Sequence, residues 1–165
     1  MERIAIVCID DEREVLDALV RDLEDFASYF RIEPCESAAD AEQVIEDLIR
    51  EGWTPGLVLA DHLMPGTSGV DFLIALNSRP ETRAARKILV TAQAGLEDTV
   101  RAVNRADLDY YVRKPWKKSE LHKVVRRFLT DFVLENSSDP LAFVPVLDAP
   151  RLFEGFRDRG APAPS

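Results

Sequence analysis

Residues 4–12 read IAIVCIDDE, a run of six apolar residues followed by three acids. An apolar run of this length is typical of a strand that is buried on both faces of a parallel sheet. The apolar residues between positions 15 and 26 then recur at the spacing of one helix face. A buried strand followed by an amphipathic helix is the first unit of an alternating α/β fold.

The same alternation continues to about residue 135. Further strands are predicted at 30–33, 57–60, 88–90 and 109–112. Further helices are predicted from Ser37 to before Gly52, around 70–78, near 96–105 and from about 119 to 135. Five strands and five helices in strict alternation predict a doubly wound, five-stranded parallel sheet, with right-handed crossovers that place helices on both faces.

Residues 136–165 differ in composition from the rest of the chain. They hold five of the ten prolines and no helical or strand period, so we interpret them as a Pro-rich tail or linker after a domain at 1–135. The last five residues, 161–165, resemble a linker to a further domain. The segment also carries seven large apolar residues, too many for an idle linker, so we expect part of it to dock on this domain or on another chain.

Composition limits where the protein can act. No apolar stretch approaches the length of a membrane span, and the N-terminus lacks a secretory signal, so we expect a cytoplasmic protein without a membrane anchor. Cys8 and Cys35 lie in apolar or strand-like contexts and are interpreted as buried, reduced thiols.

The charge is distributed unevenly along the chain. The net charge is −9, which argues against direct nucleic-acid binding by the whole surface. Residues 1–61 carry 17 acids and 5 bases, whereas residues 113–127 carry seven bases and one acid. This asymmetry suggests either a cation or phosphate site between the two parts, or two oppositely charged solvated faces.

Chemically active side chains follow four of the predicted strands. Asp10 and Asp11 follow the first strand, Asp61 the third, Thr91 the fourth and Lys114 the fifth. In an open parallel sheet, ligands bind at the carboxyl ends of the strands, so we expect these five residues to meet at one edge.

These residue types together suit phosphoryl transfer. Close carboxylates repel one another and need a cation, and hard oxygen ligands suit Mg²⁺. An Asp carboxylate is also a nucleophile toward phosphorus. Lys114 and Thr91 can each bind a phosphoryl oxygen, which is the positioning and charge neutralisation that the reaction requires. The set therefore predicts a carboxylate that accepts a phosphoryl group.

Four short motifs resemble the receiver domain of two-component response regulators. They are residues 6–12 (IVCIDDE), 57–66 (LVLADHLMPG) with Gly69, 89–92 (LVTA) and 111–115 (YVRKP). The resemblance covers about residues 3–133. It implies a flavodoxin-like sheet with strand order 2-1-3-4-5.

The resemblance also implies individual roles. Asp61 would be the phosphoacceptor. Asp10, Asp11 and Asp61 would hold Mg²⁺ together with the backbone carbonyl of Leu63. Thr91 and Lys114 would be the switch hydroxyl and the phosphate-binding amine. Tyr111 would be the aromatic that turns inward when Thr91 moves, and the Lys114–Pro115 bond is often cis in this family.

The partner implied by the resemblance is a histidine kinase or phosphotransfer protein. It would supply the phosphoryl group, whose charge would switch a partner face, a homodimer face or a fused output domain. We expect no enzymatic activity beyond self-phosphorylation and self-dephosphorylation.

Three other functions are weighed against this interpretation. A phosphatase of the haloacid-dehalogenase type would need an Asp two residues after the nucleophile, where this chain has Leu63. A nucleotide hydrolase would need a phosphate-binding loop of the form G-x-x-x-x-G-K-[ST], which the sequence lacks. The third is a constitutive interaction or dimerisation domain with an idle site and output through the tail. His62 and His122 have no acids at metal-ligand spacing and are interpreted as surface or packing residues.

Overall fold

A computed structural model describes residues 1–92 and 95–160 of the chain. Its strands are β1 (Ile4–Ile9), β2 (Arg31–Cys35), β3 (Thr54–Ala60), β4 (Arg86–Thr91) and β5 (Tyr110–Arg113). Its α-helices are α1 (Arg13–Asp22), α2 (Ala38–Arg50), α3 (Gly69–Asn77), α4 (Leu96–Ala106), α5 (Lys118–Asn136) and α6 (Ala149–Gly160). Two short 3₁₀ helices lie at Glu24–Phe26 and Pro140–Phe143.

The five strands form one parallel sheet in the order β2-β1-β3-β4-β5. This order and the flavodoxin-like fold are confirmed. The central strand β1 is buried at all six positions, which explains its continuous apolar run. β2, predicted at 30–33, forms one edge of the sheet, and its residues are mostly accessible to solvent.

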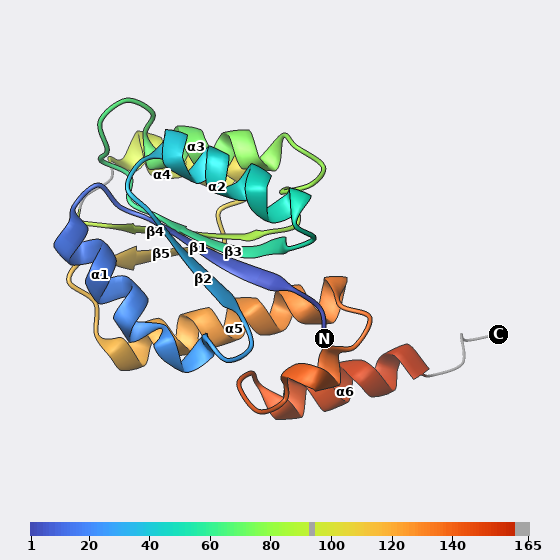
Figure 1. The fold of residues 1–165 in the computed structure, drawn as a ribbon. Coiled ribbons are helices and arrows are strands. Elements are labelled where there is room, and N and C mark those ends of the chain that lie inside the picture. Colours follow the sequence, from blue (N-terminus) through green and yellow to red (C-terminus); the bar gives the residue numbers. More distant parts are fainter. Residues whose placement is uncertain (93–94, 161–165) are drawn as a thin grey trace.

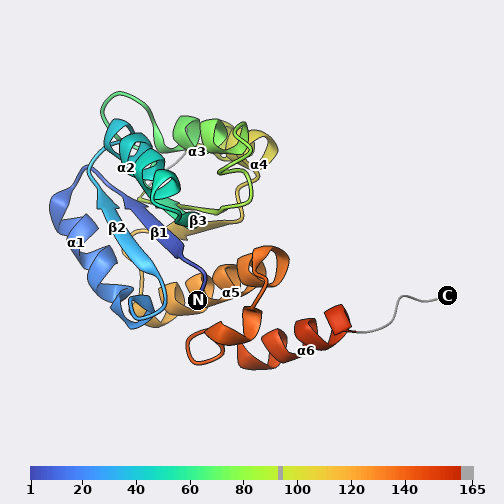
Figure 2. The same ribbon diagram turned by 45° about the vertical axis from the view of Figure 1, so that its right-hand side comes forward.

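Helices cover both faces of the sheet (Figures 1 and 2). α1 and α5 pack on one face around a core that includes Leu19, Leu57 and Phe132. α2, α3 and α4 pack on the other face around a second core that includes Ile45, Val58 and Leu73. Every crossover therefore leads from the carboxyl end of one strand through a helix to the next strand, and all five strand ends meet at one edge of the sheet.

The segment after α5 is more ordered than the sequence indicated. The expectation of no helical period is wrong for residues 140–143 and 149–160, which form the second 3₁₀ helix and α6. Pro140 and Pro150 both lie in a first helical turn, where a missing N–H costs no hydrogen bond. These prolines begin helices, although in the sequence they resembled those of a linker.

This segment docks on the core beneath the sheet, so the expectation that part of it docks is confirmed for this domain. Phe143, Leu147 and Leu152 are buried in the same core as α1 and α5, and the Phe143 ring stacks on Phe30 with centroids 5.2 Å apart. α6 lies beside α5 on the side away from the sheet (Figures 1 and 2). Residues 161–165, interpreted as a linker, lie outside the described residues.

Among residues 1–92 and 95–160, no helix is both long enough and apolar enough to cross a lipid bilayer.

Candidate functional site

Three carboxylates meet at the carboxyl edge of the sheet. Asp10 and Asp11 directly follow β1, and Asp61 directly follows the neighbouring strand β3. One carboxylate oxygen from each of the three lies within 4.8 Å of the others. Asp10 and Asp61 are 2% and 4% exposed, whereas Asp11 is open to solvent. The sheet register therefore brings together two buried acids and one accessible acid from positions 50 residues apart.

Lys114 places a cation against these acids. Its Nζ atom lies 2.6 Å from Oδ2 of Asp10 and 3.5 Å from Oδ2 of Asp61. Burial acts to lower the pKa of Lys114, but the hydrogen bond to Asp10 and the charges of Asp10, Asp61 and Glu12 outweigh it, so the pKa is raised. The amine is therefore charged at neutral pH and partly compensates the repulsion between the buried carboxylates. The peptide bond from Lys114 to Pro115 is cis, as the resemblance implied.

Thr91 ends β4, the strand that neighbours β3, at the same edge of the sheet, and is 1% exposed. Tyr111 lies on the adjacent strand β5, and its hydroxyl is 3.5 Å from the backbone oxygen of Thr91. Tyr111 is half-buried and packs against the core of α2, α3 and α4, whereas Tyr110 is 40% exposed and packs on Phe128. Of the two tyrosines, Tyr111 is thus the one in contact with the residue that ends β4.

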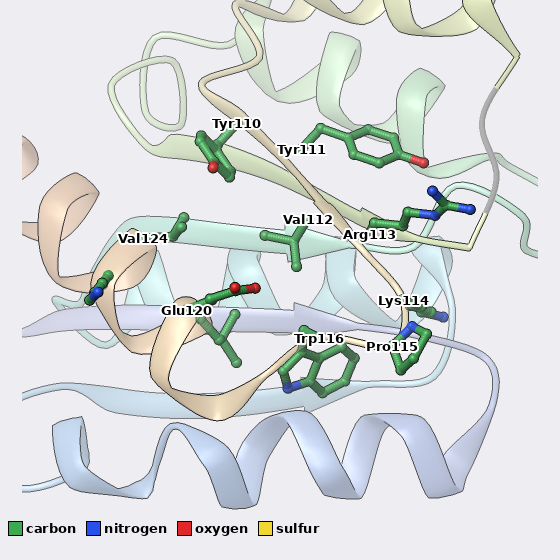
Figure 3. A pocket seen from close by; sticks show the side chains of 11 residues that line it. Tyr110, Tyr111, Val112, Arg113, Lys114, Pro115, Trp116, Glu120 and Val124 are labelled. Carbon is green, nitrogen blue, oxygen red and sulfur yellow. The ribbon is translucent and has the colours of Figure 1, made fainter.

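Figure 3 shows the groove that runs along β5 toward Lys114 and Trp116. Its volume is about 720 Å³ and it lies between β5 and the start of α5. Trp116 is held by a hydrogen bond from its indole N–H to Asp22 of α1, 2.9 Å long. Trp116 thereby connects α1 with the loop that contains Lys114.

The loop after β3 is held close to the phosphoacceptor candidate Asp61. The Gly69 N–H donates to the backbone oxygen of His62 at 3.0 Å. A Cβ at Gly69 would lie 2.0 Å from the backbone oxygen of Asp61. Only glycine permits this approach of two backbones. Ser68 accepts a hydrogen bond from the Asp71 N–H and caps α3. Leu63 lies in this loop with a largely exposed side chain, so its side chain is free to vary.

His62 was interpreted from the sequence as a surface or packing residue. The structure shows it 6% exposed, with Nε2 3.0 Å from Oδ2 of Asp98 in the first turn of α4. The interpretation missed this partner because Asp98 lies 36 residues away and no local spacing relates the two. His122, the other histidine, packs on Phe26, and its Nε2 atom lies 2.6 Å from the backbone oxygen of Asp22 and 3.7 Å from Oδ2 of Asp25.

The donor set fits a small divalent cation. Three carboxylates with oxygens within 4.8 Å of one another repel one another, and hard oxygen ligands in an accessible site are what Mg²⁺ takes in proteins, with water filling the remaining positions. A buried carboxylate beside a lysine and a threonine can also accept and hold a phosphoryl group. The sequence thus predicted correctly that Asp10, Asp11, Asp61, Thr91 and Lys114 converge on one edge of the sheet.

Comparisons with known proteins agree with this chemistry. A family model described as response regulator receiver domain matches residues 6–126. The hydrogenase transcriptional regulatory protein HoxA of Cupriavidus necator is 32% identical over 127 residues, which cover 76% of this chain and 24% of that protein. The phosphate regulon transcriptional regulatory protein PhoB of Escherichia coli is 30% identical over 133 residues, which cover 79% of this chain and 55% of that protein.

A solved structure has the same fold. The CheY-like response regulator receiver domain protein from Methanospirillum hungatei superposes with a TM-score of 0.70 at 25% identity, and the match covers 82% of this chain and all of that one. The chain spans about a quarter of HoxA and about half of PhoB, so it is similar to one part of those proteins.

Proposed function

Because the chain belongs to the receiver domain family of two-component response regulators, we propose that Asp61 accepts a phosphoryl group from a histidine kinase or phosphotransfer protein. The observation that carries this proposal is the position of Lys114, whose Nζ atom lies 3.5 Å from the Asp61 carboxylate within the acidic cluster. A phosphoryl group on Asp61 would find a fixed cation beside it.

The proposed reaction forms one bond and breaks one. An Asp61 oxygen attacks the phosphorus of a phosphohistidine, the N–P bond breaks, and the electron pair remains on the imidazole of the donor. Mg²⁺, held by Asp10, Asp11, Asp61 and the Leu63 carbonyl, would neutralise charge on the phosphoryl oxygens. Lys114 would exchange part of its interaction with Asp10 for a phosphoryl oxygen.

Two further residues would convert the modification into a change of shape. The Thr91 hydroxyl would donate to a phosphoryl oxygen, and Tyr111, in contact with the Thr91 oxygen, would follow that movement. The added charge would then bias the face that runs from β4 through α4 and β5 to α5 toward a second packing. That face would bind a partner, a second copy or a fused output domain.

This chain offers a surface next to the site on which a donor protein would bind. A mostly apolar pocket of about 500 Å³ lies between α1 and the loop after β5, with Val15 and Ala18 on one side and Pro115 and Trp116 on the other. Lys114 also lines it. An apolar patch that opens onto the reactive edge is where a helical donor could place its phosphohistidine against Asp61.

The alternative of a constitutive interaction domain depended on the apolar residues of the tail. Phe143, Leu147 and Leu152 are buried inside this domain, so they offer no surface to a partner. Phe153 and Phe156, each 49% exposed, are the side chains on which that alternative now rests. A receiver is a signalling domain, and we expect its own chemistry to be limited to self-phosphorylation and self-dephosphorylation.

The test is incubation with acetyl phosphate and Mg²⁺, followed by intact mass measurement. The wild-type chain should gain the mass of one phosphoryl group, Asp61→Asn should gain none, and Asp17→Asn, an exposed aspartate of α1, should behave as wild type. No addition to the wild-type chain, or equal addition to Asp61→Asn, would show that Asp61 is not the phosphoacceptor.

A further inference from the structure

The hydrogen bond between His62 and Asp98 joins two segments that the proposed switch must move relative to each other. His62 directly follows Asp61, and Asp98 lies seven residues after Thr91. We propose that this bond is a latch that fixes the first turn of α4 to the phosphoacceptor loop and so limits how readily the receiver switches. The inference rests on the function proposed above and identifies a residue that regulates the same site.

The His62 end of the bond is rigid. Its backbone oxygen accepts hydrogen bonds from the N–H groups of both Met64 and Gly69, and the preceding Asp61 N–H donates to Ile9 of β1. The imidazole is 7% exposed, so its rotamer is constrained by packing. A change in the His62–Asp98 distance must therefore come mainly from movement of α4.

The described side chains in the first turn of α4, those of Glu97, Asp98 and Thr99, are all polar. Among the described side chains of α4, only Ala102 and Ala106 are buried, while Val100 and Val103 are about half exposed. The polar contacts of this first turn therefore contribute to its position, and Ala102 and Ala106 anchor the later part of the helix.

The polar contacts of α4 form a short chain that begins at His62. His62 Nε2 lies 3.0 Å from Asp98, Asp98 lies 4.0 Å from Arg101, and Arg101 lies 2.6 Å from Asp71 in the first turn of α3. Asp98 and Arg101 are 42% and 38% exposed, so solvent screens their mutual attraction. The His62–Asp98 bond is the link of this chain that has a buried side chain, and it lies next to Asp61.

The His62 ring has an unsatisfied atom on its other side. Nδ1 is buried and has no hydrogen-bond partner within the described residues. Nε2 therefore makes the one polar contact that these residues provide to the buried imidazole, and loss of Asp98 would leave both ring nitrogens without a protein partner. This makes the contact sensitive to substitution on either side.

The consequence for function has a defined direction. The proposed movement of Thr91 pulls the segment that carries Asp98 and would strain or break its hydrogen bond to His62. A contact that exists in one arrangement and is strained or lost in the other stabilises the first. Removing the latch should therefore favour the switched arrangement and speed phosphorylation of Asp61.

The test compares rates of phosphorylation by acetyl phosphate. Asp98→Ala and His62→Phe should each react about fivefold faster than wild type, the factor expected for one hydrogen bond. The double variant should gain no further factor, because both changes remove the same contact. Asp98→Asn retains an oxygen that can accept from His62 and should restore a rate near that of wild type.

Glu97→Ala is the matched control, because Glu97 lies in the same first turn of α4 and contributes the same charge to the helix end. It should react at the wild-type rate. The latch is refuted if Asp98→Ala is not faster than Glu97→Ala, if Asp98→Asn is as fast as Asp98→Ala, or if the two single effects multiply in the double variant. Asp98→Ala alone suffices for this decision should His62→Phe fold poorly.

Hydrogen exchange separates failure of the latch from failure of the proposed function. Without any phosphoryl donor, the amides in the first turns of α4 should exchange about fivefold faster in Asp98→Ala than in Glu97→Ala. Faster exchange in Asp98→Ala than in Glu97→Ala, together with a wild-type chain that takes no phosphoryl group, would retain the latch and refute the phosphoacceptor role of Asp61. Equal exchange in the two variants would refute the latch.

Discussion

Lys114 donates a 2.6 Å hydrogen bond to Asp10, a residue 104 positions earlier in the chain. The contact links the ends of β5 and β1, which are separated in the sheet by β3 and β4. It places a cation among carboxylates that would otherwise repel one another, and it does so with side chains that are 12% and 3% exposed. The stability of this edge of the sheet and its reactivity therefore depend on the same few groups.

Replacing Lys114 with Met should lower the free energy of unfolding by about 2 kcal/mol at pH 7. This loss is smaller than the loss of about 3–5 kcal/mol that follows removal of one partner from a deeply buried ion pair, because this pair opens toward solvent. Equilibrium urea unfolding measures the change. Lys117→Met, which alters an exposed lysine of the same loop, should cost little, and a similar loss in both variants would contradict the pairing.

The same pair predicts a pH dependence. The pKa of Lys114 is raised in the folded chain, so its stabilising contribution is fully present below the unfolded value of about 10.4. It is lost as pH rises through the higher folded pKa. The difference in unfolding free energy between wild type and Lys114→Met should thus be constant from neutral pH to about pH 10 and should narrow above it. A difference that narrows already between pH 6 and 9 would indicate another titrating group.

Mg²⁺ should stabilise the folded chain, because the three carboxylates form a site that the unfolded chain lacks. At a concentration about one hundred times the dissociation constant, the free energy of unfolding should rise by about 2.7 kcal/mol. Asp11→Ala should abolish most of this gain and change the metal-free stability little, since Asp11 is exposed. Glu14→Ala is the control, because Glu14 is an exposed acid of α1, and this variant should keep the full stabilisation by Mg²⁺.

The sequence predicted the sheet and the convergence of the site because both follow from one geometric rule. In a parallel α/β sheet the residue after each strand reaches the same edge, so Asp61 and Thr91 could be assigned to one site without any contact information. The helix predicted at about 119–135 spans Lys118–Asn136 in the structure, since its apolar residues recur at regular spacing.

Features that depend on distant contacts could not be predicted from the sequence. Nothing local relates His62 to Asp98, and burial of a histidine is not encoded in its immediate neighbours. α6 was missed because Pro145 and Pro150 suggested a linker, and the partner that makes the segment helical is α5. The His62–Asp98 contact and α6 both depend on which distant surface packs against a residue, and the spacing of apolar residues does not predict that.

Gly69→Ala should disturb the phosphoacceptor loop. The added Cβ would lie 2.0 Å from the backbone oxygen of Asp61, so the loop must shift away from β3. We expect a loss of about 1–3 kcal/mol in stability, as for other overpacked positions, together with slower phosphorylation by acetyl phosphate. Gly95→Ala is the control, because a Cβ there would meet no atom within 4 Å. Unchanged stability and rate in Gly69→Ala would show that the close approach is dispensable.

Phe143 tests whether the segment after α5 belongs to the folded domain. Its side chain is fully buried and stacks on Phe30 between α1 and α5, so Phe143→Ala should cost about 3–5 kcal/mol of unfolding free energy. Phe153→Ala removes an equal side chain from α6, but that ring is 49% exposed and its loss should cost less than about 1 kcal/mol. Urea unfolding followed by circular dichroism measures both.

Comparison of the two variants distinguishes a structural segment from an output segment. If Phe143→Ala is strongly destabilised and Phe153→Ala is not, residues 140–152 stabilise the receiver and cannot detach to bind a partner without the cost of unfolding that part of the core. If Phe143→Ala unfolds like wild type, the segment is held only loosely, and the interaction-domain alternative gains support. Loss of self-association in Phe153→Ala with normal stability would place an output surface on the exposed face of α6.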